Sequence, residues 1–298
     1  MAIDAGPRRV VVASRRRLPL GRWLLTAAVL GWFALMILVP MAALIRQALA
    51  AGLGPMAAAL GTAEARGAFG LTLLTAALAT AVNTAFGVAF AVVLVRHKFW
   101  GRALADGLVD LPFAVSPVVA GLMLVVLYGP HGWLGPWLRA HGVKVAYALP
   151  GMVLATTFVT VPFVVREVVP VLREFGVDQE EVAYTLGAGR WRTFWRVTFP
   201  SIRWGLAYGV TLTVARSLGE FGALLVISGN ILGRTRTATL LVHDAVEGFR
   251  NVEAFAVSLV LVGTSFLLLI GVEALRNRVS GPEERATAAA AHEPGGGD

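Results

Sequence analysis

The sequence contains no cysteine, which excludes a disulfide framework, a thiolate nucleophile and a cysteine metal site. Charged residues are also scarce, at 15% of the 298 residues, whereas a typical soluble domain has about 25%. The five histidines are scattered along the chain, at His97, His131, His141, His243 and His292. This spacing does not favour a histidine metal cluster. We therefore expect no metal, no other cofactor and no catalytic residues.

Long apolar runs are abundant instead, in a chain that is 57% hydrophobic with a mean hydropathy of +0.72. A helix needs roughly 20 apolar residues to span the hydrocarbon core of a bilayer. Six segments meet this requirement: 23–45, 69–95, 111–128, 146–165, 206–228 and 254–275. Pro112, Pro117 and Pro162 interrupt the third and fourth segments and should kink them. The sequence thus predicts an all-α polytopic membrane protein with about six transmembrane helices.

The chain is basic, with a net charge of +8 and a pI near 10.9. A nucleic-acid-binding surface needs its charges on a solvated face, so we expect no nucleic-acid partner in a chain dominated by apolar runs. If residue 1 is cytoplasmic, 17 of the 26 lysines and arginines fall in inner segments and 7 in outer ones. The positive-inside rule then places both termini in the cytoplasm. We expect the cell inner (plasma) membrane as the location and membrane lipid as a partner.

The two ends of the chain differ from the apolar middle. Residues 1–22 form a basic arm, 23–278 the transmembrane domain, and 279–298 a tail whose composition predicts disorder. The arginines at 15–17 could begin a cleaved export signal, but the apolar run after them, at about 20 residues, is too long for one. We expect an uncleaved first helix.

The predicted inner loop 173–203 contains two short amphipathic pieces. The first begins at Asp178, which could cap the helix together with Glu181 in a capping box, and it ends at Gly187, which suits a left-handed turn. Positions three and four apart are neighbours on a helix, so three residues share one face: Val182, Ala183 and Leu186. This small, apolar face would allow another surface to approach closely.

The second piece has aromatic residues on one side and arginines around the rest. The aromatic residues are Trp191, Phe194 and Trp195, and the arginines are Arg190, Arg192 and Arg196. Pro200 is expected to stop this helix. Two interpretations stay open: a helix that lies in a groove of a partner, or an interfacial helix on anionic lipid.

Taken together, the two pieces resemble the loop of binding-protein-dependent ABC importer permeases. That loop reads E-A-A, then Gly four positions beyond the second Ala, then I-x-L-P. This chain keeps Glu181, Ala183, Gly187 and Pro200, and it has Val182, Val197 and Phe199 at the remaining positions. The resemblance implies a coupling helix inserted into a cleft of a partner ATPase, with Leu186 beside the motif. No phosphate-binding G-x-x-x-x-G-K-[ST] loop is present, so we expect ATP hydrolysis on partner chains and no enzyme activity here.

Arg216 and Glu220 lie near the middle of the predicted helix 206–228. Charges within a membrane helix are costly and should face the interior of the bundle. Two interpretations stay open. The residues could form a structural i,i+4 pair, or they could line the translocation pathway, where the planar guanidinium of Arg216 would fit a tetrahedral oxyanion.

Three stretches carry a narrower resemblance, to the sulfate, molybdate and tungstate permeases of the same family. Residues 215–223 resemble the signature of that group, and 111–121 and 163–167 resemble the W-type subunit of sulfate/thiosulfate transporters. The resemblance implies import of sulfate or thiosulfate. It also implies a related T-type permease subunit, two copies of an ATP-hydrolysing subunit and a periplasmic binding protein as partners. The outer loop 230–251 is either a candidate docking surface for the binding protein or an ordinary solvated loop; its charged residues are Arg234, Arg236, His243, Asp244 and Glu247. The alternatives are a molybdate or tungstate importer permease, which commonly forms a homodimer, and an ATP-independent anion channel.

Overall fold

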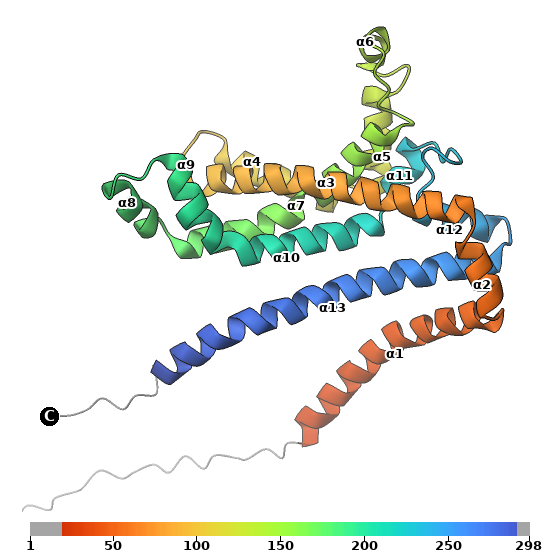
Figure 1. The fold of residues 1–298 in the computed structure, drawn as a ribbon, viewed down its shortest axis with the longest axis horizontal. Coiled ribbons are helices and arrows are strands. Elements are labelled where there is room, and N and C mark those ends of the chain that lie inside the picture. The colour runs from red at the N-terminus through yellow and green to blue at the C-terminus, as the bar shows by residue number, and fades with distance from the viewer. Residues whose placement is uncertain (1–19, 291–298) are drawn as a thin grey trace, which may run out of the picture. The chain divides into compact units, whose positions relative to one another are not determined.

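The computed structural model describes residues 20–290, and every regular element within them is helical (Figure 1). The elements are α1 (Leu20–Ala50), α2 (Leu53–Leu60), α3 (Ala63–Arg96), α4 (Arg102–Ala114), α5 (Pro117–Tyr128), α6 (Gly135–Ala140), α7 (Leu149–Phe175), α8 (Asp178–Thr185), α9 (Arg190–Thr193), the π-helix η1 (Phe194–Thr198), α10 (Phe199–Leu218), α11 (Gly222–Ile227), α12 (Ala238–Glu247) and α13 (Asn251–Ala290). The prediction of an all-α chain is confirmed.

Four of the described helices are long and apolar enough to cross a membrane, and the bent pair α4–α5 raises the number to five. The four segments are Trp23–Ala50, Ala63–Arg96, Leu149–Phe175 and Asn251–Gly271. The sequence predicts one or two more than this number, which rests on length and composition alone. The predicted helix 206–228 is divided between α10 and α11 by a break at residues 219–221, where Gly219 and Gly222 weaken helix formation.

The prolines have different effects on the two segments that they interrupt. α4 and α5 meet at an angle of 110°, directly before Pro117. Ser116 has ψ 136°, because the proline ring disfavours helical geometry in the residue before it. Pro112 and Pro162 lie inside α4 and α7, which continue through them. Among these three prolines, only Pro117 therefore coincides with a break.

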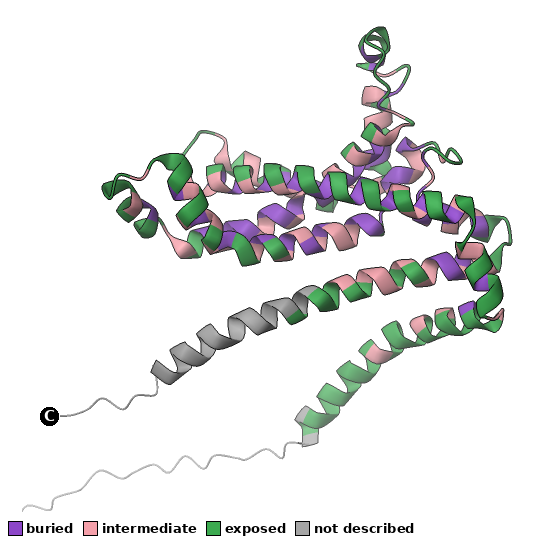
Figure 2. Cartoon of the chain, viewed as in Figure 1, coloured by how far each residue is buried: buried purple, intermediate pink, exposed green. Residues whose placement is uncertain are grey.

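The chain divides into two compact units at residue 47. In the second unit, α3, α7 and α10 pack side by side around a core of valines, leucines and isoleucines, and their inward faces are buried (Figure 2). A Cβ atom added to Gly205 would lie 2.9 Å from the carbonyl oxygen of Glu167, and one added to Gly209 would lie 3.0 Å from Cα of Val164. The backbone of α10 therefore lies directly against α7, an approach that small residues in a G-x-x-x-G spacing allow.

α1, taken by itself, is apolar on all sides. Trp23, Leu30 and Phe33 are exposed by 71%, 63% and 63%, and most of the helix is exposed along its length (Figure 2). A helix that is hydrophobic all round is covered by lipid or by other protein. Most of the predicted basic arm, residues 1–19, lies outside the described residues.

α13 continues to Ala290, so residues 279–290 of the predicted disordered tail are helical. Alanine, glutamate and arginine favour helix, and this stretch is rich in all three. The prediction of disorder was based on the lack of apolar periodicity and did not take this helix propensity into account. The last part of the predicted tail, 291–298, lies outside the described residues.

Candidate functional site

The predicted coupling loop folds as a compact cap of α8, α9 and η1. It lies at the end of the helical core where α3 and α7 end and α10 begins (Figure 1). Its short helices pack against one another. The cap therefore follows α7 in the chain and leads directly into α10, so it is joined covalently to both.

The first helix of the cap ends as predicted but begins differently. Gly187 has φ +80°, and the N–H of Ala188 donates to the carbonyl of Ala183 at 3.0 Å, so the predicted left-handed turn is confirmed. The capping box is not formed. The helix includes Asp178 in its first turn, so Val177 occupies the N-cap, and its apolar side chain has no oxygen to accept a hydrogen bond from the helix N-terminus. Asp178 and Glu181 instead place negative charge near the helix N-terminus, which the helix dipole favours.

The predicted apolar face of α8 is present as one continuous surface. Val182 and Leu186 are exposed by 57% and 83%, and together with Ala183 and Val197 they line a shallow hollow of about 410 Å³. The structure thus brings together four of the eight residues predicted for ATPase coupling. Large apolar side chains that are exposed side by side are typical of surfaces that contact another protein or a membrane.

The second piece of the loop does not stop at Pro200, contrary to the prediction. α9, η1 and α10 run on from Arg190 to Leu218 without a break, and Pro200 stands in the first turn of α10. The N–H of Phe199 donates to the carbonyl of Phe194, five positions earlier. Proline lacks an N–H and its ring crowds the preceding turn. The wider π-helical turn before Pro200 accommodates both effects.

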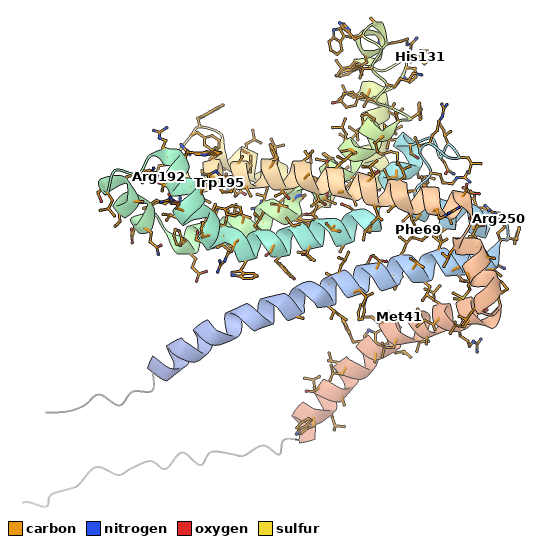
Figure 3. The ribbon with its side chains drawn as sticks, in the orientation of Figure 1. Met41, Phe69, His131, Arg192, Trp195 and Arg250 are labelled. Carbon is orange, nitrogen blue, oxygen red and sulfur yellow. The ribbon has the colours of Figure 1, made fainter. Side chains whose placement is uncertain are left out.

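Four aromatic side chains gather along this helix. Ring centroids lie 5.7 Å apart for Trp191 and Trp195, 5.3 Å for Phe194 and Trp195, and 4.9 Å for Trp195 and Phe199. Trp195 is 47% exposed, and Figure 3 places it beside Arg192 at this end of the core. The motif residue Phe199 is therefore half-buried in an aromatic cluster, while Glu181, Gly187 and Pro200 are exposed.

The sequence analysis missed the buried acid of the cap, Glu180, which is 8% exposed. Its Oε1 atom accepts hydrogen bonds from Arg96 Nη2 at 3.0 Å and from Thr198 Oγ1 at 2.8 Å. A signal for it was present. Successive residues of an α-helix are rotated by about 100°, so Glu180 lies about 200° around the helix from Val182. If Val182 faces a docking partner, Glu180 is therefore on the opposite side of the helix and faces the bundle.

Arg216 and Glu220 form the pair that the i,i+4 spacing predicts. Arg216 Nη1 lies 2.9 Å from Glu220 Oε2, and the glutamate side chain is fully buried while the arginine side chain is 35% exposed. The N–H of Ala223 donates to Glu220 Oε1 at 2.9 Å. The pair lies at the break between α10 and α11 rather than in mid-helix, and Glu220 binds the start of α11.

A second group of charges lies at the opposite end of α3. Arg236 pairs with Glu64, and its Nη2 atom lies 2.6 Å from Asp244 Oδ2. Its Nε donates to Asn230 Oδ1 at 3.0 Å. The loop 230–251, predicted to dock a binding protein, is thus tied to the first turn of α3. Within residues 20–290, no three His, Asp or Glu side chains are grouped as metal ligands.

Comparison with known proteins agrees with this architecture. The model of the family described as "Binding-protein-dependent transport system inner membrane component" matches residues 83–281. The chain is 46% identical over 257 residues to the "Sulfate transport system permease protein CysW" of Synechocystis sp. (strain ATCC 27184 / PCC 6803 / Kazusa), covering 86% of this chain and 93% of that protein. The protein of the same name from Escherichia coli (strain K12) is 42% identical, with 92% and 94% covered. A bacterial ABC transporter involved in the import of alginate shares the fold, with a TM-score of 0.72, 18% identity, and 88% and 97% covered.

Proposed function

Because the chain belongs to the family of binding-protein-dependent transport system inner membrane components, we propose that it is the W-type permease subunit of a sulfate importer. The observation that carries this proposal is the 46% identity to a sulfate permease over 93% of that relative. The names of the relatives favour sulfate over molybdate or tungstate. Thiosulfate remains part of the proposed substrate class because it is also a tetrahedral dianion.

We assign the coupling role to the exposed face of α8. Val182, Ala183 and Leu186 form an apolar surface beside Val197, and α8 ends in the left-handed turn at Gly187. An ATP-hydrolysing subunit would cover this surface, because leaving it in water is unfavourable. The cap leads without interruption into α10, so a displacement of α8 would be passed to a core helix.

The proposed complex contains this subunit, a T-type permease, two ATP-hydrolysing subunits and a periplasmic binding protein. Both termini and the cap would face the cytoplasm, which agrees with the excess of arginine in the segments assigned to the inside. Hydrolysis belongs to the partner subunits, since the sequence lacks a phosphate-binding loop. Arg216 and Glu220 are proposed to stand beside the translocation pathway, where Arg216 is one-third exposed.

Transport into vesicles tests the proposal. The complex is reconstituted with its partner subunits and binding protein, and uptake of labelled sulfate, thiosulfate, molybdate and tungstate is measured with ATP or with a non-hydrolysable analogue. We expect uptake of sulfate and thiosulfate with ATP only. Uptake that persists with the analogue would indicate a channel, and preferred uptake of molybdate or tungstate would replace the substrate assignment.

A further inference from the structure

Glu180 differs from the rest of α8 because it is buried and bonded to other elements. Its Oε1 atom accepts hydrogen bonds from Arg96 Nη2 at 3.0 Å and from Arg96 Nε at 3.3 Å. The side chains of Glu180 and Arg96 are 10% and 11% exposed. Arg96 is the last residue of α3. A charged side chain is rarely buried unless it is paired, and here one arginine supplies two donors to a single carboxylate oxygen.

Further hydrogen bonds extend this link beyond two helices. Thr198, at the end of η1, donates to the same oxygen at 2.8 Å and is 4% exposed. Arg96 Nη1 also donates to the carbonyl of Leu172, in the last turns of α7, at 3.2 Å. We use the name Glu180 node for the group formed by Arg96, Glu180, Thr198 and the Leu172 carbonyl. This node joins α3, α7, α8 and η1.

The Glu180 node connects the proposed docking helix α8 to the ends of the core helices α3 and α7. The packing of α8 is mainly against α9 and η1, which belong to the same cap, and its apolar face is exposed. The chain after α8 leads into α10, whereas a push on that face reaches the end of α3 directly only if α8 is fixed to it. Charge-assisted hydrogen bonds are short and directional, and a buried pair of this kind resists separation because each group would lose its opposite charge while it stays buried.

We propose that Glu180 is the positioning residue that fixes the coupling helix to the ends of α3 and α7, so that movement of a docked α8 reaches the helical core. This inference rests on the proposed function, because it requires an ATPase that docks on α8. The exposed residues of the α8 face bind the partner. Glu180, on the opposite side of the same helix, transmits the partner's movement.

The test compares Glu180→Gln with wild type in the reconstituted complex, by measuring labelled sulfate taken up per ATP hydrolysed. Glutamine keeps the shape of the side chain and removes its charge. We expect the ratio to fall by on the order of tenfold or more, while the ATPase still co-purifies. Glu174→Gln is the matched control, because Glu174 is an exposed carboxylate in the last turn of α7, and its ratio should equal that of wild type. An unchanged ratio in Glu180→Gln overturns the inference.

A second variant covers the case in which Glu180→Gln does not assemble. Thr198→Val removes one hydrogen bond from the node and keeps the size of the side chain, and it should lower the ratio by a smaller factor. A wild-type ratio in this variant would then overturn the inference. Failure of the proposed function is distinguishable, because in that case the wild-type complex itself would show no ATP-dependent uptake.

Spin labels supply a readout that lost stability alone would not reproduce. The chain has no native cysteine, so Thr185→Cys on α8 and Trp100→Cys just after α3, both exposed positions, can be labelled selectively. We expect one narrow distance distribution with and without bound nucleotide, because α8 and the end of α3 move together. In Glu180→Gln the distribution should broaden when nucleotide binds. A wild-type distance that changes between the two states would overturn the inference.

Discussion

Both ends of α3 are held by ion pairs, but the two pairs are built differently. At the start of the helix, Glu64 binds Arg236, which also contacts Asp244. At its end, Arg96 pairs with Glu180, the one carboxylate that forms an ion pair with it among the described residues. The helix dipole favours both arrangements, with an acid in the first turn and a base in the last.

The difference between the two ends lies in burial and in spare partners. The side chains of Glu64, Arg236 and Asp244 are 27%, 17% and 19% exposed, so loss of one acid leaves Arg236 with another. Arg96 and Glu180 are more deeply buried, at 11% and 10%. The first turn of α3 should therefore tolerate substitution, whereas the end at the cap depends on a single pair.

Removing the arginine of the cap pair should have the largest effect. Arg96→Ala leaves a buried carboxylate without its positive partner, which should lower the free energy of unfolding by about 3–5 kcal/mol. Glu64→Ala at the other end should lower it by about 1 kcal/mol, because Arg236 keeps Asp244. Unfolding of the purified protein in detergent measures both. Equal losses would remove the distinction between the two ends.

Arg216→Ala tests an ion pair that belongs to neither end of α3. The substitution leaves Glu220 with the N–H of Ala223, so we expect a loss of about 2 kcal/mol, discounted for the partial exposure of Arg216. Sulfate uptake should fall with it. Arg203→Ala, at an exposed position on the same helix, is the control and should change little. Full uptake in Arg216→Ala would exclude Arg216 from the pathway.

Leu186→Ala examines the exposed face of α8. Truncation of a well-covered interface side chain costs more than 1 kcal/mol, so binding of the ATPase subunit should weaken roughly tenfold, as titration of the purified partners would measure. Leu232→Ala, an exposed leucine in the loop that Arg236 ties to the start of α3, should leave that affinity unchanged. If both variants bind the ATPase as wild type does, the face is not the docking surface.

Two nearby glycines separate the effect of backbone conformation from that of space. A Cβ atom at either Gly187 or Gly189 meets no atom within 4 Å, but only Gly187 has positive φ. Gly187→Ala should therefore destabilise the cap by about 1 kcal/mol through left-handed strain, whereas Gly189→Ala should be near neutral. Unfolding and uptake measurements on the pair decide this, and identical behaviour would contradict a strained turn.

Trp195→Ala should have the smallest effect, because it removes aromatic contacts from a half-exposed residue. Such contacts contribute about 0.5–1.5 kcal/mol. If Trp195 lies against the ATPase, co-purification of that subunit should weaken slightly. Trp133→Ala, at an 85% exposed tryptophan before α6, is the control. Undiminished co-purification would favour the alternative in which the aromatic side faces lipid.

The sequence predicted those features that depend on local pattern. The all-helical fold follows from the length of the apolar segments. The turn at Gly187 follows from the conformational freedom of glycine, and the pairing of Arg216 with Glu220 follows from their i,i+4 spacing. The close contact of Gly205 and Gly209 with α7 also follows from spacing. Each of these depends on residues within one or two helical turns.

The features that it missed depend on contacts between distant segments. The helical phase can point to Glu180 rather than Glu181 as the inward residue, but its partner Arg96 lies 84 residues earlier, and no local pattern identifies that arginine. The position of α11 likewise depends on a distant segment, since a Cβ on Gly121 would lie 2.6 Å from the carbonyl of Ala223. The prediction that Pro200 ends the helix was wrong, because it assumed that the preceding turn stays α-helical.

The glycine contacts between α10 and α7 have a mechanical consequence. Where main chain lies against main chain, no side chain is available to repack and absorb a displacement. α10 and α7 should consequently move as one rigid body. α10 is about 30 Å long. A force applied at Pro200 would reach Glu220, just after the other end of α10, with little loss.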